Sequence, residues 1–380
     1  MKANEPGSKT WILPWGLLLS LSAVPWARAA QTPVKSVPGP ALLPDGTRVA
    51  HIALSDVTAV AGKKGWLQEE FSKVGAKADL ILVSARGGSG VETSLLDRGE
   101  LHITQRMAYP ALQHRANGLD AVVVWQGVDP PPRRAVTLVL KDSPIQSLSE
   151  LKDKTLGSSL VGCPYYASRE TLLSKGLDVD TEFGAADVRF LNITGAAAVT
   201  AFLAGRFDAY GTHPAIQTTS PLILRGETRE VSAAVPGGAY TTGGGRGMYF
   251  AMRKWAQENP DLVKAFLLAW DRTVRWLKSD GGAHFPEAAA IAAKELRLPK
   301  NVALYDLKDE STLSFSWGQT DYRDAVDSIR KFQAWAIKNK DPFYTKHHLT
   351  DAEIESFVDK RFFAGGDYFV DTSEHPARGK

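Results

Sequence analysis

Residues 155–176 decide the fold, and they read TLGSSLVGCPYYASRETLLSKG. Residues 155–158 have the length of a short strand, and residues 164–175 have helical character between Pro164 and Gly176, which are typical of helix starts and helix ends. The turn between them is rich in small residues. A strand, a turn and a helix in this order form the repeating unit of α/β proteins.

The same unit recurs on both sides of this stretch. Downstream we expect a strand at 188–193, a helix at 196–204 that Gly205 ends, and a strand at 207–210. Upstream, segments of strand length and of helical period alternate at 49–54, 65–74, 78–83, 91–96, 101–104 and 121–125. This succession predicts parallel sheets with helices on both faces, one sheet in each of two lobes.

Two further strands, at 135–140 and 248–252, are predicted to cross between the lobes. The crossings place lobe I at residues 46–138 and 243–380 and lobe II at residues 139–242. The resulting prediction is an α/β fold with two doubly wound sheets joined by two crossing strands.

Capping signals and apolar stripes predict the remaining helices. Ser147 and Glu150 have the spacing of a capping box, and Thr350 and Glu353 have the same spacing before a last helix that we expect to run to about residue 362. Apolar residues at helical spacing predict two longer helices, at 261–277 and 325–337. The chain beyond residue 252 is therefore expected to be nearly all helical.

The amino terminus has the layout of a secretory signal. Lys2 and Lys9 precede an uncharged stretch at 10–27, and small residues follow at a suitable cleavage point. A membrane anchor is the alternative, but two prolines and a glycine interrupt a run that is barely of spanning length. We predict that residues 1–29 are removed, that residues 30–45 form a linker arm, and that the exported chain carries no lipid, because no cysteine lies near the cleavage point.

Composition excludes several classes of function. The 380 residues include 45 Lys and Arg against 42 Asp and Glu, a balance that argues against nucleic-acid binding. The single cysteine, Cys163, can form neither an intramolecular disulfide nor a cysteine-based zinc site, and the eight histidines show no metal-binding spacing. No Walker A loop or GxSxG motif is present. We expect no metal, no cofactor and no catalytic residue, and therefore a binding protein.

Several predicted strands end in turns that open onto helices, and such turns can hold anionic oxygens on unpaired backbone N–H groups. In open α/β sheets the ligand lies at the carboxyl ends of the strands, so two lobes that face each other would form one cleft. The alternative is that each turn only caps its helix. The candidates in these turns are Ser55, Asp56, Gly88, Ser89, Gly162, Cys163, Tyr165 and Thr194.

The sequence resembles the substrate-binding proteins of ABC importers for aliphatic sulfonates, taurine and nitrate. The resemblance covers most of residues 47–345 and rests on the order and spacing of short motifs. These are GELHI at 99–103, GVDPP at 127–131, DSPI at 142–145, LSELKDK at 148–154, GRFDAY at 205–210, GMYFAMR at 247–253 and NPDLVKA at 259–265.

The resemblance implies a bilobal type II periplasmic binding protein fold. It also implies a monomeric periplasmic receptor that binds a small, sulfonate-like organic oxyanion and delivers it to a membrane ABC permease. Two ligand turns depart from the family pattern. A serine-rich turn corresponds to residues 160–165, where Gly162, Cys163 and Tyr165 remain as candidates, and an Ala-Trp-Asp-Pro segment corresponds loosely to residues 211–214, which include His213.

Each further candidate has two interpretations. Arg106 and Arg246 could pair with an oxyanion or be solvated, and His213 could donate to an anion or cap a turn. Tyr165 and Tyr166 could stack on a ligand or fill the space between the lobes, and Tyr240 could contact the apolar part of a ligand.

Alternative functions also remain open at this stage. Cys163 is a buried small residue or a nucleophile. If Cys163 or a histidine is a reactive group, the chain is an enzyme of the desulfinase or thiamine-precursor synthase type. A receptor that signals to a membrane sensor is a third possibility.

Overall fold

The computed structural model describes residues 41–83, 91–128, 135–160, 162–180, 186–232, 235, 238–239, 244–308 and 318–372. The predicted signal segment, most of the predicted linker arm and the candidates Gly88, Ser89 and Tyr240 lie outside these residues. The chain divides into two units, Met1–Ser36 and Val37–Lys380, and all described residues belong to the second.

The first sheet has six strands and is mixed, whereas the sequence pattern predicted parallel pairing. Its order is β1 (Ala41–Leu42), β2 (Arg48–Ala53), β4 (Ile103–Met107), β12 (Gly247–Met252) and β5 (Ala121–Gln126), with β3 (Ala76–Ile81) paired to β2. β2 is parallel to β3 and β4, but β12 is antiparallel to both β4 and β5. β12 begins at the edge where β4 ends, so it must run the opposite way.

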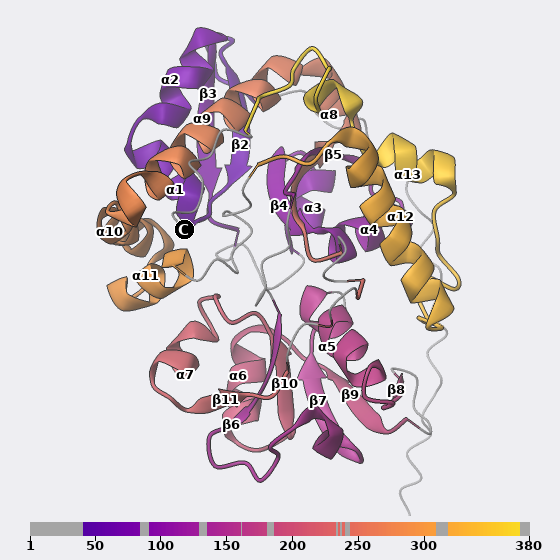
Figure 1. Ribbon diagram of the computed structural model, residues 1–380. Coiled ribbons are helices and arrows are strands. Elements are labelled where there is room, and N and C mark those ends of the chain that lie inside the picture. Colours follow the sequence, from indigo (N-terminus) through magenta and orange to yellow (C-terminus); the bar gives the residue numbers. More distant parts are fainter. Residues whose placement is uncertain are drawn as a thin grey trace, which may run out of the picture. The chain divides into compact units, whose positions relative to one another are not determined.

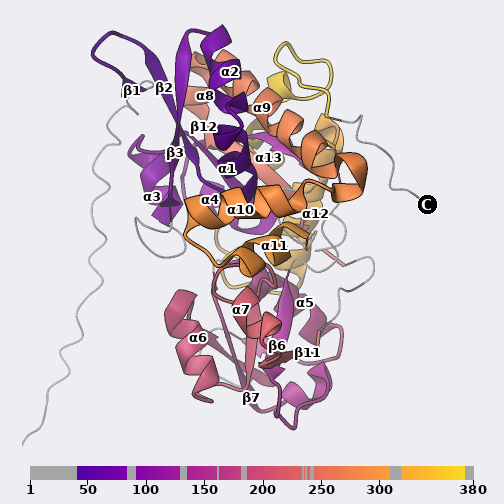
Figure 2. The same ribbon diagram turned by 90° about the vertical axis from the view of Figure 1, so that its left-hand side faces the viewer.

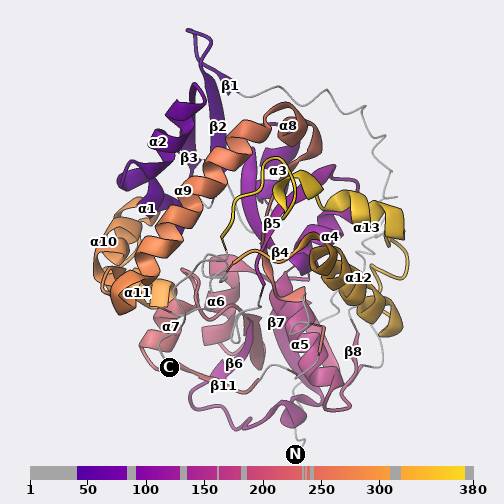
Figure 3. The ribbon, with the colours of Figure 1, turned by 45° about the horizontal axis from the view of Figure 1, so that its top comes forward.

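Long helices from the C-terminal part of the chain pack beside this sheet (Figures 1 and 3). α9 (Pro260–Lys278) contacts α1 (Asp56–Lys63) and α2 (Trp66–Lys73), and α12 (Tyr322–Lys338) contacts α4 (Ala108–Ala116) and α13 (Asp351–Phe357). The predicted apolar stripe of α9 is buried, with Phe266 and Trp270 at most 1% exposed. The prediction of two long helices here is confirmed.

The second sheet also has six strands. Its order is β11 (Thr228–Glu230), β6 (Val136–Leu140), β10 (Ala209–Thr212), β7 (Lys154–Ser158), β9 (Val188–Asn192) and β8 (Val179–Asp180). β10, β7, β9 and β8 are parallel to one another. β6 is antiparallel to β10, and β11 is antiparallel to β6. The sequence-based expectation of an α/β fold with two sheets is therefore confirmed.

Three helices pack on the second sheet: α5 (Cys163–Leu173), α6 (Gly195–Leu203) and α7 (Ser220–Leu224). α7 also contacts α11 (Lys300–Lys308), which pairs with α10 (Phe285–Leu296), and Figure 2 shows these helices near one another. Gly176 and Gly205 follow α5 and α6 in the left-handed conformation, with φ of +74° and +66°, as their positions predicted.

α5 joins the two sheets, because its first turn belongs to the hydrophobic core of the first sheet. Cys163, Tyr165 and Tyr166 are part of that core, and the ring of Tyr166 lies 5.2 Å from that of Tyr109 in α4. Deeper in α5, Arg169 is paired with Asp341 beyond the end of α12. The helix that the sequence predicted at residues 164–175 thus contributes to both cores.

Two local predictions need correction. Ser147 does not cap its helix: its hydroxyl donates to Glu150, and residues Leu148–Leu151 form a short 3₁₀ helix. The Glu150 N–H, which in a capping box would donate to the Ser147 hydroxyl, donates instead to the Ser147 carbonyl at 3.2 Å, as in a 3₁₀ turn. The last helix, α13, has the predicted capping box at Thr350 and Glu353 but ends at Phe357, earlier than expected.

Candidate functional site

The parallel pairing of β7 and β10 brings two predicted site segments together. Leu156 and Gly157 of β7 lie opposite Ala209 and Tyr210 of β10, and the Ser158 hydroxyl donates to the Gly211 carbonyl at 2.8 Å. Parallel strands end at the same edge of a sheet, so the turn after β7, which leads to α5, and the turn after β10 emerge side by side.

At this edge Cys163 meets His213. Cys163 Sγ lies 3.1 Å from His213 Nε2, and the cysteine is 6% exposed while the histidine is half-buried. Cys163 is the first residue of α5, and its N-cap, Gly162, provides no side-chain hydrogen bond. The structure therefore pairs a thiol with an imidazole at a helix start, two residues that lie 50 positions apart in sequence.

Thr194 lies at the same edge, because β9 is the other parallel neighbour of β7. It is the N-cap residue of α6, is exposed, and makes no side-chain capping bond. The ends of β7, β9 and β10 thus carry Cys163, Thr194 and His213. These three predicted residues form the best-defined candidate site among the described residues.

The two tyrosines of α5 are packed against other aromatic rings. Tyr165 is 3% exposed and contacts Phe190 edge-on at 4.8 Å. Tyr166 is 1% exposed, and the rings of Tyr109, Phe332 and Tyr344 surround it. Burial raises the pKa of Tyr166 well above its ordinary value. For Tyr166 this packing favours a role in filling space over stacking on a ligand.

In the first sheet, the turn after β2 is a helix cap. The Ser55 hydroxyl accepts from the Thr58 N–H and the Thr58 hydroxyl accepts from the Ser55 N–H, which is a complete capping box. The Asp56 carboxylate accepts from the Val57 N–H at 2.8 Å. The N–H groups of this turn already donate within it, and the negative charge of the Asp56 carboxylate would repel an anion. These contacts favour capping over anion binding at this turn.

Both candidate arginines are held by carboxylates. Arg106, on β4, is paired with Glu92 of α3 (Val91–Asp97), and both side chains are mostly buried. Arg246, just before β12, donates to Asp324 at 2.6 Å and is 12% exposed. Since Arg106 lies opposite Met248 in the β4–β12 pairing, both arginines lie near the same end of the first sheet.

Thr320 completes the Arg246 pair by donating to the same Asp324 oxygen at 2.6 Å. Partial burial raises the pKa of Asp324, but hydrogen bonds from Thr320 and Arg246 outweigh it and lower the pKa overall. Asp324 is therefore ionised at neutral pH. An oxyanion that binds Arg246 must share the guanidinium with this carboxylate or displace it.

Sequence reasoning missed the charged pair in the middle of α5. Arg169 lies 3.0 Å from Asp341 and also donates to the Asn339 carbonyl at 2.6 Å. The neighbouring Glu170 accepts from the Ala239 N–H. One feature of the sequence indicates that these charges have partners. The polar residues of segment 163–172 do not gather on one face, which is typical of a helix buried on all sides, and charges in such a helix need partners.

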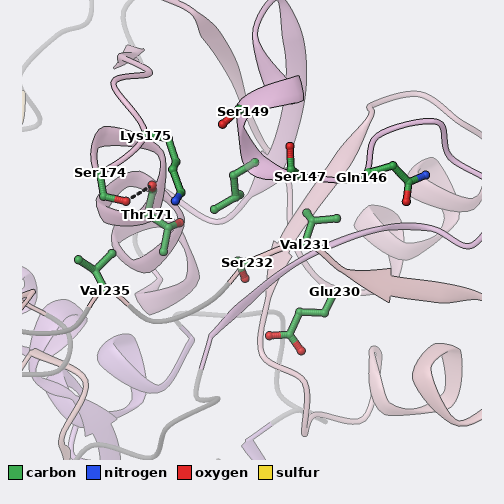
Figure 4. A pocket seen from close by; sticks show the side chains of 11 residues that line it. Gln146, Ser147, Ser149, Thr171, Ser174, Lys175, Glu230, Val231, Ser232 and Val235 are labelled. Atoms are coloured by element: carbon green, nitrogen blue, oxygen red, sulfur yellow. Dashed lines mark hydrogen bonds between the residues drawn. The ribbon is translucent and has the colours of Figure 1, made fainter.

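A separate cavity of about 550 Å³ lies beside the second sheet and is lined in part by residues at the C-terminal end of α5 (Figure 4). Its walls carry hydroxyl groups, with Lys175 and Glu230 as the charged residues. Some of the hydroxyls are already engaged: Ser174 donates to the Thr171 carbonyl at 2.7 Å, and Ser232 accepts from the Thr137 N–H. No site residue predicted from the sequence lines this cavity.

Comparison with known proteins gives a family and a fold. A family model described as NMT1/THI5 like matches residues 58–281. No curated protein matches the chain significantly. Within the described residues, no helix has the length and apolar character needed to cross a membrane.

Three solved structures illustrate the fold. The alkanesulfonate-binding protein SsuA from Xanthomonas axonopodis pv. citri, bound to MOPS, is 18% identical, with a TM-score of 0.64 over 82% of this chain and 98% of its own. The periplasmic aliphatic sulphonate binding protein SsuA from Escherichia coli is 22% identical, with a TM-score of 0.55 over 69% and 83%. A cysteine-to-serine mutant of DszB, in complex with biphenyl-2-sulfinic acid, is 14% identical, with a TM-score of 0.54 over 84% and 97%.

Proposed function

The chain belongs to the NMT1/THI5-like family, and from this premise we propose that it is a solute receptor that binds a small, sulfonate-like organic oxyanion without turnover. The ligand would lie in a cleft between lobe I, residues 46–138 and 243–380, and lobe II, residues 139–242. The observation that carries the proposal is the contact of Cys163 with His213 at the carboxyl edge of the second sheet, where Thr194 also lies. Ligands of open α/β sheets bind at this edge.

The chemistry of this edge suits an oxyanion. The start of α5 has no side-chain cap, so the positive end of its helix dipole is directed at the same region as His213, although Pro164 has no N–H and the Tyr165 N–H donates to the Gly162 carbonyl. A sulfonate is a singly charged group that accepts several hydrogen bonds, and the His213 imidazole and the exposed Thr194 hydroxyl can donate to it. The two sulfonate-binding structures of the same fold support this ligand class.

We further propose that the protein is exported, with residues 1–29 removed and no lipid attached, and that it acts in the periplasm as a monomer that delivers its ligand to an ABC permease. The basic and uncharged segments before residue 29 and the periplasmic origin of the structurally similar SsuA support this. A gene neighbourhood that encodes a permease and its ATPase would support transport over signalling to a membrane sensor.

The proposal is tested by calorimetric titration of the purified protein with alkyl and aryl sulfonates, taurine and nitrate. We expect saturable binding of at least one sulfonate, weakened in His213→Gln. Lys175→Ala, which alters the separate cavity at the other end of α5, is the matched control and should bind as the wild type does. Absence of heat with every anion would contradict the proposed ligand class.

One observation favours a second function. The contact between Cys163 and His213 has the geometry of a nucleophile beside a base, and the desulfurization enzyme DszB has the same fold. If the chain is an enzyme of the desulfinase type, it releases sulfite from an aryl sulfinate, and Cys163→Ser abolishes that release. Binding of the sulfinate without sulfite release favours the receptor.

A further inference from the structure

The contact between Cys163 and His213 has chemical consequences of its own. The distance of 3.1 Å between sulfur and nitrogen allows a proton to be shared between the thiol and the imidazole. Two elements fix this geometry: the start of α5 positions the cysteine, and the end of β10 positions the histidine. The close pairing of β7 with β10 holds both in place, since a Cβ on Gly157 would lie 2.7 Å from the Phe207 ring.

The helix start favours transfer of the proton from sulfur to nitrogen. Cys163 is the first residue of an 11-residue helix, whose positive end stabilises a negative charge placed there. Gly162, as the N-cap, brings no side-chain oxygen to neutralise that end. A thiolate at this position therefore has both an imidazolium and the helix dipole to stabilise it.

We propose that Cys163 and His213 form a thiolate–imidazolium pair and that Cys163 is a site of modification by small hydroperoxides. The thiolate sulfur attacks one peroxide oxygen, an S–O bond forms and the O–O bond breaks. The leaving alkoxide or hydroxide takes the proton from the His213 imidazolium and departs as alcohol or water. Sulfur is oxidised to a sulfenic acid and the peroxide is reduced.

Burial and the lack of a second cysteine define the reaction further. Because Cys163 is only 6% exposed, the reagent must be small. Because the chain has no other cysteine, the sulfenic acid cannot be resolved as an intramolecular disulfide, and its reduction needs an external thiol. The modification would place an oxygen atom at the edge where the proposed ligand binds, so it would also lower sulfonate affinity.

The test is the rate at which hydrogen peroxide oxidises Cys163 at neutral pH, measured by mass spectrometry after trapping of the sulfenic acid with dimedone. We expect the folded wild-type protein to react faster than the same protein unfolded in urea. We also expect His213→Gln to react roughly tenfold more slowly than the wild type, because the thiol loses the imidazole that takes its proton. His348→Gln, at an exposed histidine, is the matched control and should react at the wild-type rate.

A second measurement separates ionisation from access. The ultraviolet absorbance of a thiolate, taken as the difference between the wild type and Cys163→Ser, should be present at neutral pH and should be lost in His213→Gln. Equal peroxide rates in the wild type and His213→Gln, or no thiolate absorbance in the wild type, would overturn the proposal. Calorimetric titration with sulfonates does not depend on the reactivity of Cys163 and tests the proposed function alone, so the two proposals can fail separately.

Discussion

The guanidinium of Arg169 lies 3.0 Å from the carboxylate of Asp341, and the two side chains are only 4% and 2% exposed. The pair fixes α5 of the second sheet to the segment after α12, which packs with the first sheet. Burial of the carboxyl raises the pKa of Asp341, although the Tyr344 N–H and Arg169 oppose this rise. A buried charge in this position depends on its partner.

Arg169→Ala is therefore expected to lower the free energy of unfolding by ~3–5 kcal/mol, because it leaves the Asp341 carboxyl buried without its cation. The double variant Arg169→Met with Asp341→Asn should recover much of this loss, because the asparagine oxygen can still accept from the Phe343 and Tyr344 N–H groups. Urea unfolding measures both. Arg272→Ala, which breaks an exposed pair with Glu69, is the control and should have little effect. A loss in Arg169→Ala no larger than that of the control would contradict the structural role of the pair.

Gly157→Ala is expected to disturb the register that brings the Cys163 and His213 turns together. The added Cβ would lie 2.7 Å from the Phe207 ring, and overpacking of this kind costs about 1–3 kcal/mol. The double variant Gly157→Ala with Phe207→Leu removes the clashing ring and should unfold at a higher urea concentration than the single variant Gly157→Ala. If Gly157→Ala unfolds as the wild type does, the close packing at β7 is not required.

His102 makes the protein sensitive to acid. Its ring stacks on Trp255 at 4.8 Å and is 1% exposed, and burial, with a smaller contribution from His51, lowers the pKa of His102 to about 3. An unfolded histidine binds its proton at about 6.5, so between about 6.5 and about 3 the unfolded chain holds a proton that the folded chain lacks. The free energy of unfolding therefore falls as pH falls through this window.

His102→Asn tests this dependence, because the asparagine oxygen can still accept from the His51 N–H while the side chain does not titrate. Melting temperatures measured across the window should fall less steeply with acid in His102→Asn than in the wild type. His348→Asn, at an exposed site, should follow the wild type. Parallel curves for the wild type and His102→Asn would exclude His102 as the source.

The ion pair of Arg246 with Asp324 predicts opposite effects of two variants on oxyanion binding. If Arg246 contacts the ligand, Arg246→Gln should weaken binding by roughly ten- to a hundredfold, since hydrogen bonds to a charge contribute ~1.5–3 kcal/mol. Asp324→Asn removes the competing carboxylate and should strengthen binding. Calorimetry with one sulfonate measures both, and equal affinities in all three proteins would place Arg246 outside the site.

Local sequence signals predicted most of the elements. Gly176 and Gly205 end their helices, and the stripe of α9 is buried, because such features depend only on nearby residues. The direction of β12 was not predictable in this way. It follows from where the chain returns to the first sheet, which no local pattern encodes.

The candidate site was predicted in part. Cys163 and His213 were separate candidates, each from its own turn, and the parallel pairing of β7 with β10 makes them neighbours. The partners that hold Arg169, Arg106 and Arg246 were not predicted. Arg169 and Asp341 are 172 residues apart, and a charge gives no sign in the sequence of the distant charge that neutralises it.

The central claim is that this chain binds one small organic oxyanion and returns it unchanged. Native mass spectrometry of the purified protein with a sulfonate tests this most directly. The account predicts a mass increase of one intact ligand per chain, with the same sulfonate recovered after release. No added mass with any sulfonate, or release of sulfite from an aryl sulfinate in a reaction that Cys163→Ser abolishes, would contradict it.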